Sequence, residues 1–336
     1  MIRLSGPSAL TLSLTVSLAG PASAEIKAID DAVMSEITGT SGVTIELETS
    51  VSLARFAWKD AGSLNIDNIA LTGQNGAMMD NMKFTLDIAG DNEVLDFGFS
   101  EIARRASNGQ LDPNSNPDIA DALATYSSGG SFGKEFNDGD MVIHLGPTDS
   151  GDPTSLDSYL KAIDFRLSMD SIYLEDSQGI AGTTMFSDIT LDGYLGPTDI
   201  VVRNSDGATR FLDNGNEVSR SELQIDSHFE ISQGSLNWDV ADVILIFNLA
   251  AVGIDGLQMH NRRGADTLGH FGMASVSASL SSGTSAISGT EGLSVHDVEF
   301  RADIDMPVFR LGDNSIGSVN FTDFAITNTS LMVYGH

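Results

Sequence analysis

The stretch Leu64–Leu71, with the sequence LNIDNIAL, decides the fold class of this chain. Its apolar side chains occupy the first, third, sixth and eighth positions, and the polar pair Asp67-Asn68 separates the two halves. Successive side chains of a regular strand point to opposite faces of a sheet, so its apolar residues keep one parity. The change of parity therefore predicts a β-bulge, which keeps both halves on one face while the strand bends.

The same pattern recurs in four later stretches, which start at residues 167, 184, 293 and 319. Their polar pairs are Asp170-Ser171, Ser187-Asp188, His296-Asp297 and Thr322-Asp323, and the copy at 184 is the weakest. A change of parity also occurs at the corners of a β-solenoid. The copies have no fixed period, so we rank the solenoid second, after a curled antiparallel sheet.

Hairpin signals run through the whole chain. Asn-Gly and Asp-Gly dipeptides follow strand-like segments, and both residues of such a dipeptide adopt the positive φ values of a tight turn. They lie at Asn75-Gly76, Asn108-Gly109, Asp138-Gly139, Asp192-Gly193, Asp206-Gly207, Asn214-Gly215 and Asp255-Gly256. The sequence therefore predicts an all-β protein with curled, mainly antiparallel sheets, either sandwich-like or solenoid-like. The repeated pentapeptide LGPTD, at 145–149 and 195–199, is interpreted as a reused turn.

Residues 1–24 have the pattern of a signal peptide. Arg3 gives a positive start, Ala9–Leu18 is apolar, and Ala22-Ser23-Ala24 is a cleavage signal of small residues. A membrane anchor, the alternative, needs roughly 17 to 25 apolar residues without such interruptions. The pattern predicts export to the cell surface or the extracellular space, with the periplasm as the alternative.

Residues 25–42 are expected to form a short helical motif. Asp30 and Asp31 suit a helix N-cap, and Gly39 and Gly42 suit its end. From Val43 the apolar period becomes two, so residues 43–336 are expected to form the β-rich domain. The stretch 101–160 is predicted to be a loop and helix insertion, with a helix at 118–126 after a cluster of Pro and Asn residues.

Composition excludes some classes of function. The chain has 17 Lys+Arg against 47 Asp+Glu, a net charge of −30, so binding to nucleic acid is not expected. It has no cysteine and therefore no disulfide, which suits a bacterial envelope protein with a sizeable core. Calcium binding by acidic turns stays open, because Ca²⁺ prefers oxygen ligands. No other cofactor and no small-molecule substrate are expected.

The sequence gives little support for catalytic or metal-binding residues. Ser131 matches the letters of a nucleophile elbow, but the stretch Gly129–Gly133 lacks the strand-to-helix context that this motif needs. No two histidines have the three- or four-residue separation of a helical zinc pair. We expect His260 to be solvated or stacked and His296 to form surface hydrogen bonds. The sequence therefore predicts a non-enzyme without a metal site.

Val243–Ile254 is the most apolar run after the N-terminal segment. It is too short for a transmembrane helix, and we interpret it as a buried strand followed by a second one. A lipid-facing strand of an outer-membrane barrel is the alternative interpretation of this run.

Both ends of the chain resemble a known family. The block DDAVMSEITGTSGVTIELET after a signal peptide, and the ending ITNTSLMVYGH, resemble the FilA-like putative pilus-system proteins, which are uncharacterised exported β-rich proteins of Gram-negative bacteria. Thr40 departs from the glutamine expected there. The resemblance implies a filament-associated or surface role and no catalytic residues. The matched positions are Asp30, Asp31, Met34, Thr38, Gly39, Gly42, Val43, Ile45, Tyr334, Gly335 and His336.

We therefore expect an exported structural or adhesive surface protein, a component of a pilus or filament system. It would act by contacts with other envelope or filament proteins, or with copies of itself. Val43–Thr49 and Ser330–Tyr334 are candidate sheet edges that could accept a strand from a neighbour. The alternative functions are an outer-membrane β-barrel or pore and, with least support, a secreted hydrolase.

Overall fold

The computed structural model describes residues 42–90, 98–127, 136–148, 155–205, 207–239, 251–264 and 271–335. The signal segment, the helical motif up to Ser41, and Ser131 lie outside these residues. The described strands form one hydrogen-bonded sheet in which every pair of neighbours is antiparallel. The predicted all-β class is confirmed, and within the described residues the form is one curled sheet rather than a stack of parallel coils.

Two branches of strands join on the long strand β7 (Ala181–Val202). The first branch pairs with the C-terminal part of β7 and consists of β1 (Val43–Thr49), β4 (Met79–Ile88) and β5 (Met141–Pro147). The second pairs with its N-terminal part and consists of β2 (Val51–Lys59), β3 (Ser63–Thr72) and β6 (Ile163–Glu175). The 3-10 turn η1 (Gln74–Gly76) connects β3 to β4.

The sheet continues from β7 to the C-terminal strands. Next comes β10 (Leu223–Trp238), then β13 (Ala274–Thr284) along its first half, and β11 (Val252–Asp255) and β12 (Gln258–His260) along its second half. The last two strands are β14 (Glu291–Leu311) and β15 (Asn314–Val333), and the short strands β8 (Thr209–Phe211) and β9 (Glu217–Ser219) attach to β13. β11 contains the end of the predicted strand run Val243–Ile254; residues 240–250 lie outside the described part.

A residue with a positive φ lies at the mid-strand change of parity in four of the five predicted units, and in three of these four the change of parity is a bulge. The second residue of each polar pair has a positive φ, which Asn and Asp tolerate better than other non-glycine residues. These residues are Asn68 (φ 51°), Asp188 (52°), Asp297 (51°) and Asp323 (52°). The strand register shifts beside Asp188, Asp297 and Asp323, as an extra residue in one strand requires.

At Asn68 the register continues, because the neighbouring strands change parity at the same level. Leu53 of β2 pairs with Ile69 and Phe56 pairs with Ile66, so β2 repeats the pattern of β3. Apolar side chains therefore stay opposite one another in a row across the sheet. One such row runs from Phe56 through Ile66, Ile172 and Phe186 to Trp238.

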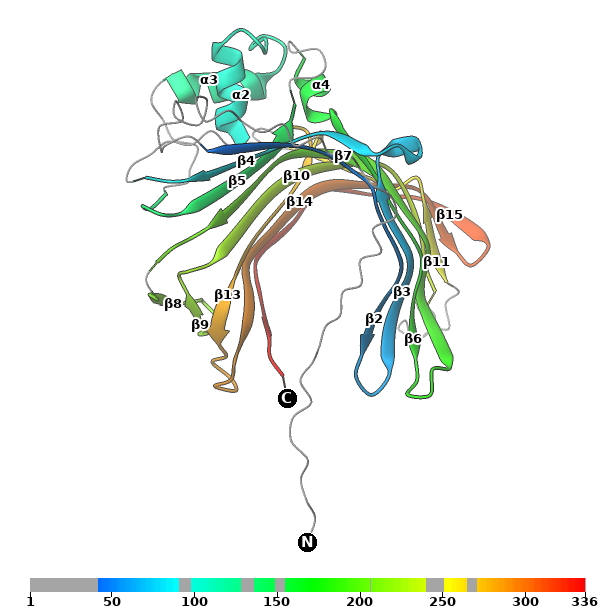
Figure 1. Ribbon diagram of the computed structural model, residues 1–336. Coiled ribbons are helices and arrows are strands. Elements are labelled where there is room, and N and C mark those ends of the chain that lie inside the picture. The colour runs from blue at the N-terminus through cyan, green and yellow to red at the C-terminus, as the bar shows by residue number, and fades with distance from the viewer. Residues whose placement is uncertain are drawn as a thin grey trace, which may run out of the picture. The chain divides into compact units, whose positions relative to one another are not determined.

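The long strands bend, so that the sheet has a convex and a concave face (Figure 1). Bulges explain this bending, because they increase local twist and kink the strand that carries them. The second LGPTD copy takes part in it, and the prediction of a turn there was wrong. Gly196 and Pro197 lie buried inside β7, where the register against β10 shifts between Leu195 and Thr198. Pro fits at this point because a bulge needs no ladder hydrogen bond from it.

Three helices lie on the convex face (Figure 1): α2 (Gly98–Ser107), α3 (Pro117–Ser127), which confirms the predicted helix, and α4 (Leu156–Leu160). They bury Ile102, Ile119 and Leu156 against Met273, and Tyr194 of β7 packs against this cluster. Burying a side chain of this size contributes about 1.5–3 kcal/mol. The stretch 101–160 therefore carries helices as expected, but it also supplies the sheet strand β5.

The concave face carries a second apolar cluster. Leu195 follows Tyr194 and so points to the opposite face, where it packs with Phe165, Ile231 and Met82. This cluster continues into apolar rows on both halves of the bent strands, where the side chains are partly or fully exposed. None of the helices in the described part of the chain has the length and apolar character needed to cross a membrane.

We predict that Asn68→Val destabilises the protein by about 1–2 kcal/mol, because a β-branched residue is strained at a positive φ. Asn68→Gly should cost less, since glycine adopts this φ freely, although it loses the hydrogen bond from Asn68 Nδ2 to Asp170 Oδ2 of 2.6 Å. Urea unfolding measures both. Ala70→Val in the same strand is the control and should be near neutral; an equal cost at both positions would contradict a positive φ at position 68.

Candidate functional site

The strands β1 and β2 form one edge of the sheet. Among the described strands, β1 pairs with β4 and with no other, and β2 pairs with β3 and with no other. Only Ser50 separates the two strands, and both run in the same direction, so their outer sides form one edge from Val43 to Lys59. The predicted edge at Val43–Thr49 is confirmed and extends further than expected.

The strand β15 forms the opposite edge. Within the described residues it pairs with β14 and with no other strand. Natural proteins protect such edges with short strands, proline or lysine. β15 is 20 residues long, contains no proline or lysine, and has Asp323 as its one charged residue. The predicted edge at Ser330–Tyr334 is confirmed as the end of this strand, and its outer side is open to another strand.

Large apolar side chains are exposed along both edges. On the first edge Phe56 is 47% exposed and Trp58 is 61% exposed; on β15 Phe321 is 44% and Leu331 57% exposed. Single exposed apolar residues are common, but contiguous patches mark sites of interaction. The exposed members are Val43, Ile45, Leu47, Val51, Leu53, Phe56 and Trp58 on one edge, and Ile316, Phe321, Phe324, Ile326, Leu331 and Val333 on the other.

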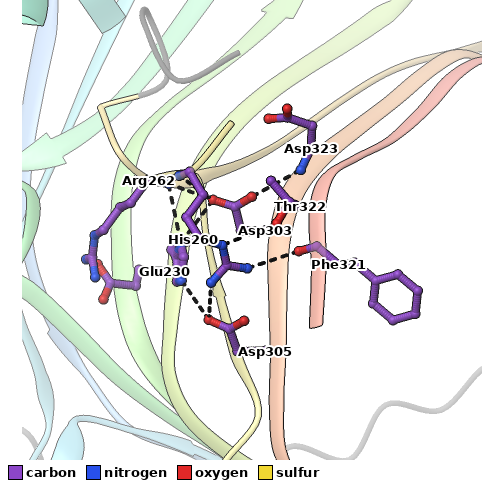
Figure 2. Close-up of polar contacts among 9 residues, drawn as sticks. Glu230, His260, Arg262, Asp303, Asp305, Phe321, Thr322 and Asp323 are labelled. Atoms are coloured by element: carbon purple, nitrogen blue, oxygen red, sulfur yellow. Dashed lines mark hydrogen bonds and ion pairs between the residues drawn. The ribbon is translucent and has the colours of Figure 1, made fainter. Parts of the chain in front are cut away.

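An ionic cluster behind β15 fixes its central bulge (Figure 2). Asp303 of β14 is fully buried, and its Oδ1 accepts a hydrogen bond from the backbone N–H of Asp323 at 3.1 Å. Its Oδ2 accepts from the backbone N–H groups of Arg262 (2.9 Å) and Arg263 (2.7 Å). One carboxylate therefore connects the bulge of the edge strand to the loop after β12.

Arg263 holds the same bulge from the other side. Its Nη2 donates to the backbone carbonyl of Phe321 at 3.1 Å, and its Nη1 donates to Asp305 Oδ2 at 2.7 Å. The hydrogen bond from Arg263 lowers the pKa of Asp305, against an opposing effect of burial, and raises the pKa of Arg263. His260 Nε2 lies 3.1 Å from the same oxygen of Asp305. Figure 2 shows these groups converging beside β14 and β15.

Two histidine predictions were wrong. His260 is 7% exposed and lies between Asp303 and Asp305, so it is neither solvated nor stacked on a ring. His296 has no exposed surface, and its Nε2 lies 3.1 Å from Glu222 Oε2. The corner position of the repeat suggested a wet surface, but the neighbouring strands cover it. A carboxylate partner makes the burial of each ring tolerable.

Arginine–carboxylate pairs are the feature that the sequence interpretation missed. Arg166 contacts Asp192, Arg310 contacts Asp255, and Arg203 contacts Asp140, in each case between strands or at their ends. The sequence signal that could have predicted these pairs is an arginine on the polar side of a strand with alternating polar and apolar residues. These pairs are distributed over the face opposite the apolar rows and explain where much of the positive charge of an acidic chain is used.

A cavity of about 300 Å³ lies between α3, α4, the middle of β10 and the loop that follows β12. Four of its charged side chains form two ion pairs: Lys161 Nζ lies 2.8 Å from Asp157 Oδ1, and Arg262 contacts Glu230; Asp118 is the fifth charged residue of the lining. Among the described residues no group of three or more His, Asp or Glu is placed to hold a metal ion.

The residues of the family resemblance divide between the described and the remaining chain. Val43 and Ile45 lie on the edge strand β1, with Gly42 just before it, and Tyr334 and Gly335 follow the edge strand β15. Asp30, Asp31, Met34, Thr38, Gly39 and His336 lie outside the described residues. The described members of both motifs are thus found at the two edges of the sheet.

Comparison with known proteins gives one match. Residues 4–90 are similar to a family of unknown function, DUF6160, and this match includes the strands β1 to β4. Neither a curated protein nor a solved structure matches the chain.

We predict that Asp303→Asn lowers the free energy of unfolding by about 1–3 kcal/mol. In the wild type, three backbone N–H groups donate to the two carboxylate oxygens of Asp303, whereas an asparagine side chain has only one acceptor oxygen. Hydrogen exchange should increase at Arg262, Arg263 or Asp323, and urea unfolding gives the cost. Asp313→Asn, in the exposed turn between β14 and β15, is the control and should change stability by less than about 0.5 kcal/mol. Equal costs would contradict the role of Asp303.

The lowered pKa of Asp305 predicts acid sensitivity. Asp305 stabilises the fold fully above its unfolded pKa of about 3.9, and this contribution is lost as the pH falls through the lower folded pKa. Wild type should therefore exceed Asp305→Asn in stability at pH 6, and the difference should shrink below pH 4. Arg263→Gln should show the same shrinking difference in urea unfolding. A difference that stays constant from pH 6 to pH 3 would refute this coupling.

Proposed function

We propose that this chain is an exported structural protein of a bacterial cell surface, which acts through contacts with other proteins and catalyses no reaction. The observation that carries the proposal is the pair of long sheet edges, each with exposed apolar side chains and without proline. A sheet edge presents unpaired backbone N–H and C=O groups, which another strand can satisfy.

Two further points support a role in assembly. The sequence resemblance to filament-associated proteins involves Val43, Ile45 and Tyr334, which lie on or beside these edges. The net charge of −30 favours solubility after export, and the edges themselves carry few of these charges. Four of the five charged side chains that line the cavity near α3 and α4 form ion pairs with each other, which does not favour a role of these four in acid–base chemistry.

Fractionation of cells that produce the tagged chain tests this proposal. We expect the chain in surface assemblies that mechanical shearing releases without detergent. Recovery only in a detergent-requiring membrane fraction, or only as a monomer in the periplasm, would contradict the proposed function.

We also predict that deletion of the last seven residues, Ser330–His336, abolishes incorporation into these assemblies and leaves a folded monomer. The deletion removes the end of β15, whose exposed residues include Leu331 and Val333, while the central bulge stays held by Asp303 and Arg263. Deletion of Gly335 and His336 alone is the control, because both follow the strand. Normal incorporation of the seven-residue deletion would exclude this edge from assembly.

A further inference from the structure

We propose that the two edges bind each other between copies, so that β15 of one chain pairs with β1 and β2 of the next. This inference rests on the proposed function and names the partner as a second copy of the same chain.

Strand direction permits the contact. Seven antiparallel pairings lead from β2 across the sheet to β15, and seven also lead from β1 to β15. Because direction reverses at each pairing, the two edges run in opposite directions. A second copy in the same orientation, placed beside the first, therefore meets it with an antiparallel pair of edges and continues the sheet.

The apolar positions of β2 and β15 match in this arrangement. Both strands change parity in the middle, at Ala54-Arg55 and at Thr322-Asp323. Antiparallel alignment of these two pairs places Phe56 opposite Phe321 and Leu53 opposite Phe324. Directly opposite pairs of this kind stabilise a sheet through contact of their side chains.

The same alignment extends to β1. Val51 falls opposite Ile326, and beyond this point each edge contains an irregularity. β15 has an extra residue at Asn328, whose φ is 52°, and the first edge is interrupted at Ser50. With Asn328 counted as a bulge, Leu47 lies opposite Leu331 and Ile45 lies opposite Val333. The exposed apolar residues of both edges are then paired along most of their length.

Charge favours this contact over pairing of two identical edges. Aligned in the same way, two β15 strands bring two copies of Asp323 together, and two β2 strands bring two copies of Arg55 together. The mixed pair places Arg55 beside Asp323. Opposite charges across two strands are stabilising and like charges are destabilising. In the contact between β15 of one copy and β1 and β2 of the next, every copy within a row also has both of its edges covered.

The contact is of the heterologous type. Each copy uses a different surface on its two sides, so the assembly grows as an open filament unless the rotation between copies closes a ring. A filament requires no further subunit. This agrees with the surface role proposed above and gives it a specific mechanism.

The test uses two variants of the full chain, each blocked at one edge. The first carries Ile326→Lys and Leu331→Lys on β15; the second carries Leu47→Lys and Val51→Lys on the opposite edge. In these variants lysine replaces apolar side chains that would pair across the contact, and a charge at such a position opposes the approach of the other strand. Thr327→Lys and Ser52→Lys, on the same strands but on the opposite face, are the matched controls. Analytical ultracentrifugation measures the mass of each chain alone and of equimolar mixtures.

We expect wild type and both controls to form extended assemblies, and each blocked variant to remain monomeric, with association weakened at least about tenfold. An equimolar mixture of the two blocked variants should form a dimer and nothing larger, because one intact edge remains on each. This dimer also demonstrates that both variants are folded.

Three results would overturn the inference: a monomeric wild type, a blocked variant that dimerises alone, or a mixture that stays monomeric. The last two would indicate contact between identical edges or no contact between edges. A monomeric wild type that is nevertheless found in surface assemblies with another protein would leave the proposed function intact and refute self-association alone.

Discussion

The structure depends on one backbone constraint, the left-handed residue placed in the middle of a long strand. Asn68, Asp188, Asp297 and Asp323 each adopt a φ near 50°. Without this residue, a sequence with apolar residues at the first, third, sixth and eighth positions would place half of them on each face. The left-handed residue returns them to one face, and the bends at the bulges beside Asp188, Asp297 and Asp323 help to form the concave surface on which the apolar rows lie.

The opposite face depends on polar pairing, which the bulges also organise. Asp297 and Asp323 lie beside the buried groups His296 and Asp303; His296 contacts Glu222, the residue before β10, and Asp303 accepts a hydrogen bond from β15. A buried carboxylate without such partners would cost several kcal/mol. The burial of Asp303 is tolerated because three backbone N–H groups donate to its carboxylate. One of them belongs to Asp323, so Asp303 also holds the edge strand β15 at its central bulge.

The parity pattern of the eight-residue units predicted the bulges and the curled sheet, because both are local consequences of side-chain alternation. The sites of His260 and His296 were not predictable in this way. Their burial follows from strands that are distant in sequence, such as the pairing of Ser279 with His296. The bulge at Gly196-Pro197 was also missed, because Gly-Pro favours a turn unless the surrounding strand is long enough to continue through it.

The eight-residue pattern reads the same in both chain directions, and this property links the fold to its proposed use. An antiparallel neighbour with the same pattern automatically places apolar residues opposite apolar residues, as in the row from Phe56 to Trp238. The rule that assembles the interior of the sheet therefore also applies at β2 and β15, beyond which the described part of the chain supplies no further strand. A strand from another copy satisfies the rule without any change in the fold.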